Sequence, residues 1–158
     1  LAALVARLVV GESLEKAVAA ELHRPELIHP ERAFPGFGRG EIAEECRAMF
    51  TRALEVARTP AHPWEIFEKE GWEGWCGDEA LAIALFSVLR HPESLEEAIV
   101  VATFHTGDSD TTGAVAGAIA GALHGEAAVP ERWLETLERR EEIAGLAGDL
   151  FGFFGPGV

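Results

Sequence analysis

The stretch 107–113, Gly-Asp-Ser-Asp-Thr-Thr-Gly, places two carboxylates and a neighbouring hydroxyl within four residues. The side-chain oxygens of Asp108, Asp110 and Thr111 are hard ligands of the kind that Mg²⁺ or Mn²⁺ takes. A helical pattern begins at the same place, and helix N-termini offer backbone N–H groups and a positive dipole end to anionic groups. An aspartate ahead of a helix is also a common N-cap. From these residues alone, metal binding and helix capping therefore both stay open.

The helix expected after this stretch has glycine at every fourth position, at Gly113, Gly117 and Gly121. One face of that helix then carries almost no side chain, so neighbouring helices can approach closely and hold the acidic stretch still. A similar spacing occurs where membrane helices pair, but the uncharged run 111–123 is too short for a bilayer, which needs roughly 20 residues. The pattern predicts a buried helix that packs tightly against its neighbours.

Three segments in the right order and at the right separations resemble the ADP-ribosylglycohydrolase family, which includes dinitrogenase reductase-activating glycohydrolase. The first is 106–125, Thr-Gly-Asp-Ser-Asp-Thr-Thr-Gly-Ala-Val-Ala-Gly-Ala-Ile-Ala-Gly-Ala-Leu-His-Gly, which is similar to the C-terminal signature of that family. Downstream, 129–133 (Val-Pro-Glu-Arg-Trp) looks like the start of the next helix. Upstream, 74–85 (Gly-Trp-Cys-Gly-Asp-Glu-Ala-Leu-Ala-Ile-Ala-Leu) looks like a glycine-aromatic stretch that leads into a helix.

The resemblance implies a binuclear Mg²⁺ or Mn²⁺ centre in which Asp108, Asp110 and Thr111 are ligands, with Asp108 and Asp110 as the catalytic residues. Two such ions can clamp ribose oxygens, orient a water molecule and stabilise charge while a glycosidic bond breaks. The implied activity is hydrolysis of ADP-ribosylated protein side chains or of small ADP-ribose conjugates. Which linkage is cut, and whether Mg²⁺ or Mn²⁺ is used, the sequence does not say.

The same resemblance implies where the substrate lies. Gly107 and Ser109 are expected to contact it, and Trp75 occupies the position at which the family places a side chain near adenosine. An indole at Trp75 could stack on adenine, although a core tryptophan is an equally good interpretation. Glu79 is expected to stabilise the loop beside it. His105 is expected to face solvent.

The resemblance also implies further metal ligands, in a Thr-Asp-Asp motif that lies earlier in the family. No Thr-Asp-Asp occurs in this sequence. We therefore expect the chain to be the C-terminal portion of a family domain, completed by an N-terminal segment. The alternative is a relative without catalytic activity that binds ADP-ribose or serves as a structural protein.

The chain as a whole predicts one compact, multi-helix, all-α domain over residues 1–158. Hydrophobic residues make up 48% of the chain and charged residues 25%, as in ordinary globular domains. Helical spacing is strong at 42–57, 78–90 and 95–104, and a further helical stretch, 131–151, has an expected break near Arg140. Residues 99–104 have β-propensity, but Ser94 and Glu97 form a capping box that favours helix.

The net charge of −14, from 27 acidic and 13 basic residues, argues against nucleic acid and anionic membranes as partners. Two cysteines, Cys46 and Cys76, match no zinc or disulfide pattern. Because the sequence shows neither a signal peptide nor a membrane-spanning run, a cytoplasmic location is expected.

Overall fold

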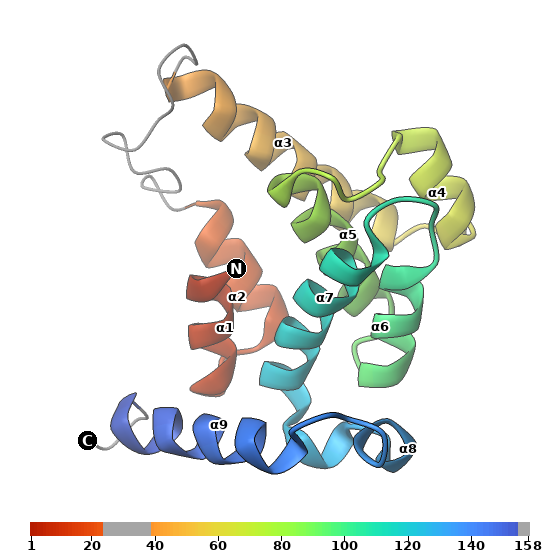
Figure 1. Ribbon diagram of the computed structural model, residues 1–158. Helices are drawn as coiled ribbons and strands as arrows, with labels where there is room; N and C mark the ends of the chain where they lie inside the picture. Colours follow the sequence, from red (N-terminus) through yellow and green to blue (C-terminus); the bar gives the residue numbers. More distant parts are fainter. Residues whose placement is uncertain (24–38, 155–158) are drawn as a thin grey trace. The chain divides into compact units, whose positions relative to one another are not determined.

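The part of the chain that the structure describes is built from helices and contains no strand (Figure 1). The structure is a computed structural model. It describes residues 1–23 and 39–154, and the side chains of 39–43 and 154 are left aside. The expected all-α fold is confirmed. The helices are α1 (Ala2–Val9), α2 (Leu14–Leu22), α3 (Arg39–Ala57), α4 (Pro63–Glu70), α5 (Gly77–Arg90), α6 (Leu95–Thr103), α7 (Ser109–His124), the short 3₁₀ helix η2 (Glu126–Ala128), α8 (Glu131–Leu134) and α9 (Arg140–Phe154).

The chain divides into two compact units, 1–128 and 129–158. The first contains α1 to η2, and the second contains α8 and α9. Each unit is described by itself below. The expectation of one domain over 1–158 stays a prediction.

Helix α5 forms the centre of the first unit, because it packs against α3, α6 and α7 (Figure 1). Its side chains Ile83, Phe86 and Val88 have no solvent exposure. Burying each such side chain stabilises the fold by about 1.5–3 kcal/mol. The buried hydroxyl of Ser87 donates to the carbonyl of Ile83 at 2.8 Å, so this apolar centre contains no unpaired polar group at that position.

Helices α6 and α7 pack closely where α7 carries its first glycine. A Cβ at Gly113 would lie 2.7 Å from Cγ2 of Thr103, and one at Gly117 would lie 3.6 Å from Cδ1 of Ile99. At Gly121 no atom lies within 4 Å of such a Cβ. The predicted close approach is therefore confirmed over the first half of α7 and is absent at Gly121.

Two arginines form hydrogen bonds that join α3, α4 and α5. The Arg52 guanidinium donates two hydrogen bonds to the carboxylate of Glu70, at 3.0 and 2.8 Å, and so joins α3 to α4. Arg90, at the end of α5, donates to the carbonyls of Thr59 and Ala61. These bonds fix the connection between α3 and α4 against the central helix.

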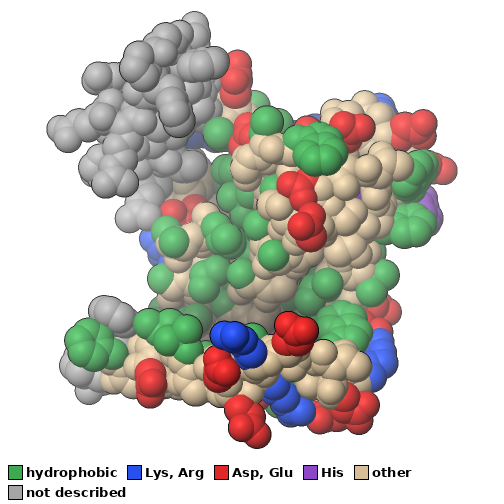
Figure 2. All heavy atoms as spheres, in the orientation of Figure 1, with side chains coloured by type: hydrophobic (Ala, Val, Ile, Leu, Met, Phe, Trp, Pro, Cys, Tyr) green, Lys and Arg blue, Asp and Glu red, His purple; other side chains and the backbone are tan. Residues whose placement is uncertain are grey.

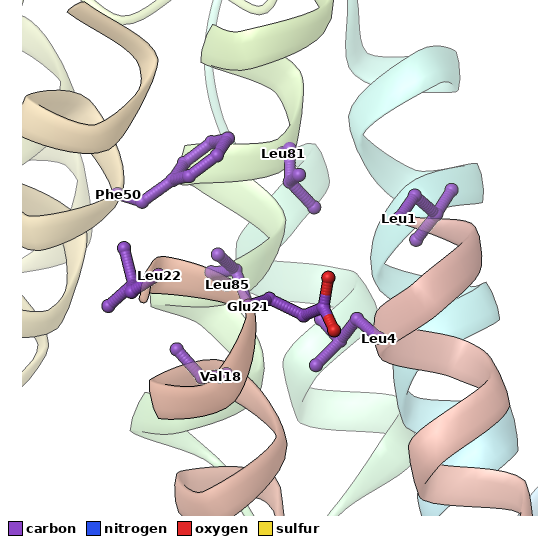
Figure 3. A pocket seen from close by; sticks show the side chains of 8 residues that line it. All are labelled: Leu1, Leu4, Val18, Glu21, Leu22, Phe50, Leu81 and Leu85. Atoms are coloured by element: carbon purple, nitrogen blue, oxygen red, sulfur yellow. The ribbon is translucent and has the colours of Figure 1, made fainter. Parts of the chain in front are cut away.

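A small apolar pocket of about 60 Å³ lies between α1, α2, α3 and α5 (Figure 3). Leucine side chains and Phe50 supply most of its wall, and Glu21 points in from α2. The Glu21 carboxylate accepts a hydrogen bond from Nε of Arg7 at 2.8 Å. The pocket thus belongs to the packing of the first two helices against the core.

In the second unit, a short helix and a longer one are separated by a break. Arg139 adopts a φ of 58°, in the left-handed region that non-glycine residues rarely enter, and α9 begins at the next residue. Arg140 donates to the carboxylate of Glu131 at 2.9 Å, which links the two helices. The expected break near Arg140 is confirmed. Among the helices described, none is long and apolar enough to cross a membrane.

Candidate metal and ligand site

The acidic stretch lies at the point where the loop after α6 becomes helix α7. Asp108 is the N-cap, and its Oδ1 accepts a hydrogen bond from the backbone N–H of Thr111 at 3.4 Å. The capping interpretation of Asp108 is thus confirmed. Asp110 and Thr111 lie in the first turn and are exposed. Capping occupies a single hydrogen-bonding position on one carboxylate, so it leaves oxygens of all three side chains available as ligands.

The two carboxyl groups of this turn lie close enough to interact. The pKa of Asp108 is below its ordinary value of 3.8, first because of a side-chain hydrogen bond with the Asp110 carboxyl and then because of hydrogen bonds from Thr111. Asp108 therefore stays ionised at neutral pH, as a metal ligand must. Figure 2 shows acidic side chains on the face where α5 and α7 begin.

The three side-chain oxygens are of the chemical type that Mg²⁺ or Mn²⁺ takes, and a six-coordinate set would need further ligands. Within residues 1–23 and 39–154, no group of three or more histidine, cysteine, aspartate or glutamate side chains is placed to hold a metal ion. The described residues thus supply two carboxylates and one hydroxyl, all from the first turn of α7 and its cap.

A second loop, 71–76, lies directly against the acidic stretch. The backbone N–H of Asp108 donates to the carbonyl of Glu73 at 2.7 Å. A Cβ at Gly107 would lie 1.9 Å from that carbonyl oxygen, so only glycine allows the two loops to approach this closely. This contact explains glycine at position 107, and its expected contact with substrate stays a prediction.

The carboxylate of Glu79 holds the 71–76 loop in shape. Its Oε2 accepts hydrogen bonds from the backbone N–H groups of Gly74 at 2.7 Å and Trp75 at 3.1 Å. The expected loop-stabilising role of Glu79 is confirmed. Gly74 has a φ of 81°, and a Cβ there would lie 2.6 Å from Cγ2 of Thr112, so a glycine is required for two separate reasons.

The side chain of Trp75 stands out from this loop. The residue is 67% exposed, and its indole N–H donates to the Glu73 carboxylate at 3.1 Å. It is therefore not a core tryptophan, in contrast with Trp72, which is 5% exposed. An exposed indole beside the acidic stretch is available for stacking, and stacking on adenine stays a prediction.

Two residues of the site were missed or misplaced by the sequence analysis. His105 was expected to face solvent, but it is half-buried, and its ring nitrogens contact the backbone N–H of Gly107 and the hydroxyl of Thr112. The Thr112 side chain is fully buried. The hydroxyl of Ser109 lies 3.4 Å from the carbonyl of His105, so it too faces the loop. No sequence pattern marks Thr112, since its partners come from the end of α6 and from the loop.

A hollow of about 200 Å³ lies between α4 and the two loops. Trp64 and Trp72 line one part of it, and Glu73, His105 and Thr106 line another. The 71–76 loop and the loop that precedes α7 are therefore accessible from the α4 side as well as from the side that carries Asp110.

Comparison with known proteins places this chain in a family. The sequence profile described as ADP-ribosylglycohydrolase matches residues 1–156. ADP-ribosylhydrolase ARH1 of Dictyostelium discoideum is 38% identical over 80 residues, which are 51% of this chain and 20% of that protein. ADP-ribosylhydrolase ARH3 of Mus musculus is 37% identical over 86 residues, 48% of this chain and 23% of that protein.

A bacterial relative is similar to the same extent. ADP-ribosylarginine hydrolase Tri1 of Serratia proteamaculans (strain 568) is 36% identical over 73 residues, 46% of this chain and 20% of that protein. The chain spans about a fifth to a quarter of the length of these curated relatives. No solved structure matches it. Because the profile match extends over nearly all of the sequence, the chain belongs to the ADP-ribosylglycohydrolase family.

Proposed function

We propose that this chain supplies the C-terminal part of the active site of a metal-dependent hydrolase. The reaction is cleavage of the glycosidic bond that joins ADP-ribose to a protein side chain or to a small conjugate. The observation that carries the proposal is the grouping of Asp108, Asp110 and Thr111 at the first turn of α7, in a chain that belongs to the ADP-ribosylglycohydrolase family. The relatives' names, ADP-ribosylhydrolase and ADP-ribosylarginine hydrolase, support the substrate class.

Asp108, Asp110 and Thr111 are the residues that would hold two Mg²⁺ or Mn²⁺ ions, together with ligands from outside the described residues. When bound, such ions neutralise charge and lower the pKa of a bound water molecule. Asp108 and Asp110 are the proposed catalytic residues, because their carboxylates would fix the site's geometry. The N-terminus of α7 adds a positive dipole end in a chain with a net charge of −14, which favours a pyrophosphate there.

The loops that flank the carboxylates are the proposed substrate contacts. Trp75 offers an exposed indole face on which adenine can stack, and Glu79 holds the backbone of that residue. Gly107 and Ser109 lie on either side of Asp108, where backbone and hydroxyl groups can contact ribose or phosphate. We further propose that the protein acts in the cytoplasm on ADP-ribosylated proteins or small ADP-ribose conjugates, and on neither nucleic acid nor membranes.

Calorimetric titration with ADP-ribose, once in Mg²⁺ and once in EDTA, tests the proposal. Binding is expected in Mg²⁺ and is expected to disappear in EDTA and in the Asp110→Asn variant. Equal binding in Mg²⁺ and EDTA would contradict the metal site. The Glu126→Gln variant serves as the control, because Glu126 is an exposed carboxylate at the far end of α7.

A relative that binds ADP-ribose without hydrolysing it, or that has a structural role, is the second candidate. It is favoured by the small ligand set, since the described residues bring only two carboxylates together at α7. Incubation with arginine-linked and serine-linked ADP-ribose conjugates separates the two. Metal-dependent binding without release of ADP-ribose from either conjugate would favour the second candidate.

A further inference from the structure

The hydrogen bonds of the His105 ring select one tautomer of the neutral imidazole. The backbone N–H of Gly107 donates to Nδ1 of the ring at 3.1 Å, so Nδ1 carries a lone pair and no proton. The proton of the neutral ring is then on Nε2, which lies 2.9 Å from the hydroxyl oxygen of Thr112. The ring therefore donates to Thr112.

The hydroxyl of Thr112 in turn donates a hydrogen bond to α6. Its single proton has the carbonyl oxygen of Ala102 at 2.7 Å, its shortest contact, while its oxygen accepts from His105. The bonds form one directed chain, from the Gly107 N–H through the imidazole and the hydroxyl to Ala102. Because Thr112 is fully buried, water cannot replace any of these partners at its side chain.

The hydrogen bonds of the His105 ring fix the backbone that carries the acidic stretch. Gly107 is held by His105, and the next N–H, that of Asp108, is held by the carbonyl of Glu73 at 2.7 Å. The His105 ring packs edge-on against the buried ring of Phe67, with centroids 5.9 Å apart and planes at 88°. The ring cannot turn away without exposing that contact.

We propose that His105, as the neutral Nε2–H tautomer, is a positioning residue that fixes the Gly107–Asp108 backbone and thereby aims the Asp108 carboxylate. The hydrogen bonds of its ring run to Gly107 and Thr112. The role in metal binding rests on the proposed metal site, whereas the role in fixing the backbone is independent of metal.

Two substitutions separate the acceptor function of Nδ1 from the donor function of Nε2. In His105→Asn, the amide oxygen takes the place of Nδ1 and can still accept from Gly107. In His105→Gln, the amide N–H takes the place of Nε2 and can still donate to Thr112, but the acceptor for Gly107 is lost. His91→Gln is the matched control, since His91 pairs with Glu97 at the end of α5, away from the loop.

Amide hydrogen exchange and Mn²⁺ binding are then measured for the wild type and all three variants. His105→Gln is expected to speed exchange at the Gly107 amide about tenfold and to weaken Mn²⁺ binding about tenfold. His105→Asn is expected to keep both close to wild type while lowering Tm, because Thr112 loses its donor. Equal effects of the two substitutions on Gly107 exchange, or wild-type exchange in His105→Gln, would overturn the proposal.

Nitrogen NMR of the His105 ring tests the tautomer directly. The expected spectrum has a protonated Nε2 and an unprotonated Nδ1, and the opposite tautomer would overturn the proposal. If the wild type fails to bind Mn²⁺, Asp108, Asp110 and Thr111 do not form a metal site within this chain, and the exchange and tautomer data still decide the role of His105. If the wild type binds Mn²⁺ and His105→Gln binds it equally well, the inference fails while the metal site stands.

Discussion

At the scale of single residues, Gly107 is the position with the least room. A side chain there must displace the carbonyl of Glu73, since its Cβ would lie 1.9 Å from that oxygen. We expect Gly107→Ala to break the hydrogen bond from Asp108 to Glu73, to destabilise the fold by about 1–3 kcal/mol and to weaken metal-dependent ADP-ribose binding. Urea unfolding and calorimetry measure the two effects.

Gly77→Ala is the control for this substitution. Gly77 begins α5, and a Cβ there meets nothing within 4 Å. Alanine at this position should leave stability unchanged or raise it slightly, since it lowers the entropy of the unfolded chain. Equal destabilisation by both alanines would show that the close approach at Gly107 carries no energetic weight.

The two aspartates of the acidic stretch should respond differently to substitution. Asp108 caps α7 as well as serving as a proposed ligand, whereas Asp110 is exposed and has no capping role. We expect Asp108→Ala to lower Tm through loss of the cap, and Asp108→Asn and Asp110→Asn to keep Tm close to wild type. All three are expected to lose metal-dependent ADP-ribose binding, measured by calorimetry. Tight Mg²⁺-dependent binding by Asp110→Asn would remove Asp110 from the ligand set.

At the scale of helices, the contact of α6 with α7 depends on Gly113. A Cβ there would lie 2.7 Å from Cγ2 of Thr103, so Gly113→Ala must push the two helices apart or rotate Thr103. We expect a destabilisation of about 1–3 kcal/mol in urea unfolding. At Gly121, where a Cβ meets nothing within 4 Å, alanine should instead stabilise the helix by up to about 1 kcal/mol. Effects of the same sign at both positions would contradict this account of the packing.

The link between α3 and α4 should make stability depend on acid pH. Hydrogen bonds from Arg52 hold the pKa of Glu70 below its ordinary value of 4.5. The stabilisation is therefore present above that value and is lost as the pH falls through the lower pKa of the folded state. We expect Glu70→Gln to lower Tm by a few degrees at neutral pH, and the difference from wild type to shrink as the solution is acidified. Thermal unfolding across this pH range measures it.

Glu55→Gln is the matched control for Glu70. Glu55 also accepts from Arg52, but its side chain is 58% exposed, against 17% for Glu70. Its removal should change Tm less at every pH, because exposed pairs are screened by solvent. A pH-independent difference between wild type and Glu70→Gln would show that the ion pair is not the cause.

At the scale of the whole molecule, the sequence predicted those features that depend on neighbours along the chain. Ser94 accepts from the backbone N–H of Glu97, which is one half of the predicted capping box, and α6 begins at the next residue after Ser94. The other half is absent, because the Ser94 N–H donates to the carbonyl of His91 and the Glu97 carboxylate pairs with the His91 ring. The grouping of Asp108 and Asp110 follows in the same way, because both lie at one helix start. In both cases the interacting residues are only two or three positions apart, so the local sequence pattern is enough to predict the contact.

Contacts between distant segments could not be predicted in this way. The bond from Asp108 to Glu73 and the burial of Thr112 both depend on how α5, α6 and α7 pack, which no local pattern specifies. His105 was misplaced for the same reason, since its second partner comes from α7 and its packing partner, Phe67, from α4. The residues that the sequence could not predict are therefore those that support the acidic stretch, Glu73, His105 and Thr112.

The division into two units gives a prediction at this largest scale. Residues 1–128 contain every candidate site residue and form a compact unit. We expect a chain that ends at Ala128 to unfold cooperatively and to retain the metal-dependent binding of the longer chain, as measured by circular dichroism and calorimetry. Loss of cooperative unfolding on truncation would show that 129–158 is needed to complete the fold of 1–128.

The hydrogen bond between Asp108 and Glu73 has a consequence for how two ligands would affect each other. It joins the loop that carries the carboxylates to the loop that carries Trp75, so neither can shift without the other. A divalent cation at the first loop and an aromatic ligand on the second would then be thermodynamically linked. By reciprocity, the factor by which the cation tightens binding of the aromatic ligand equals the factor by which that ligand tightens binding of the cation.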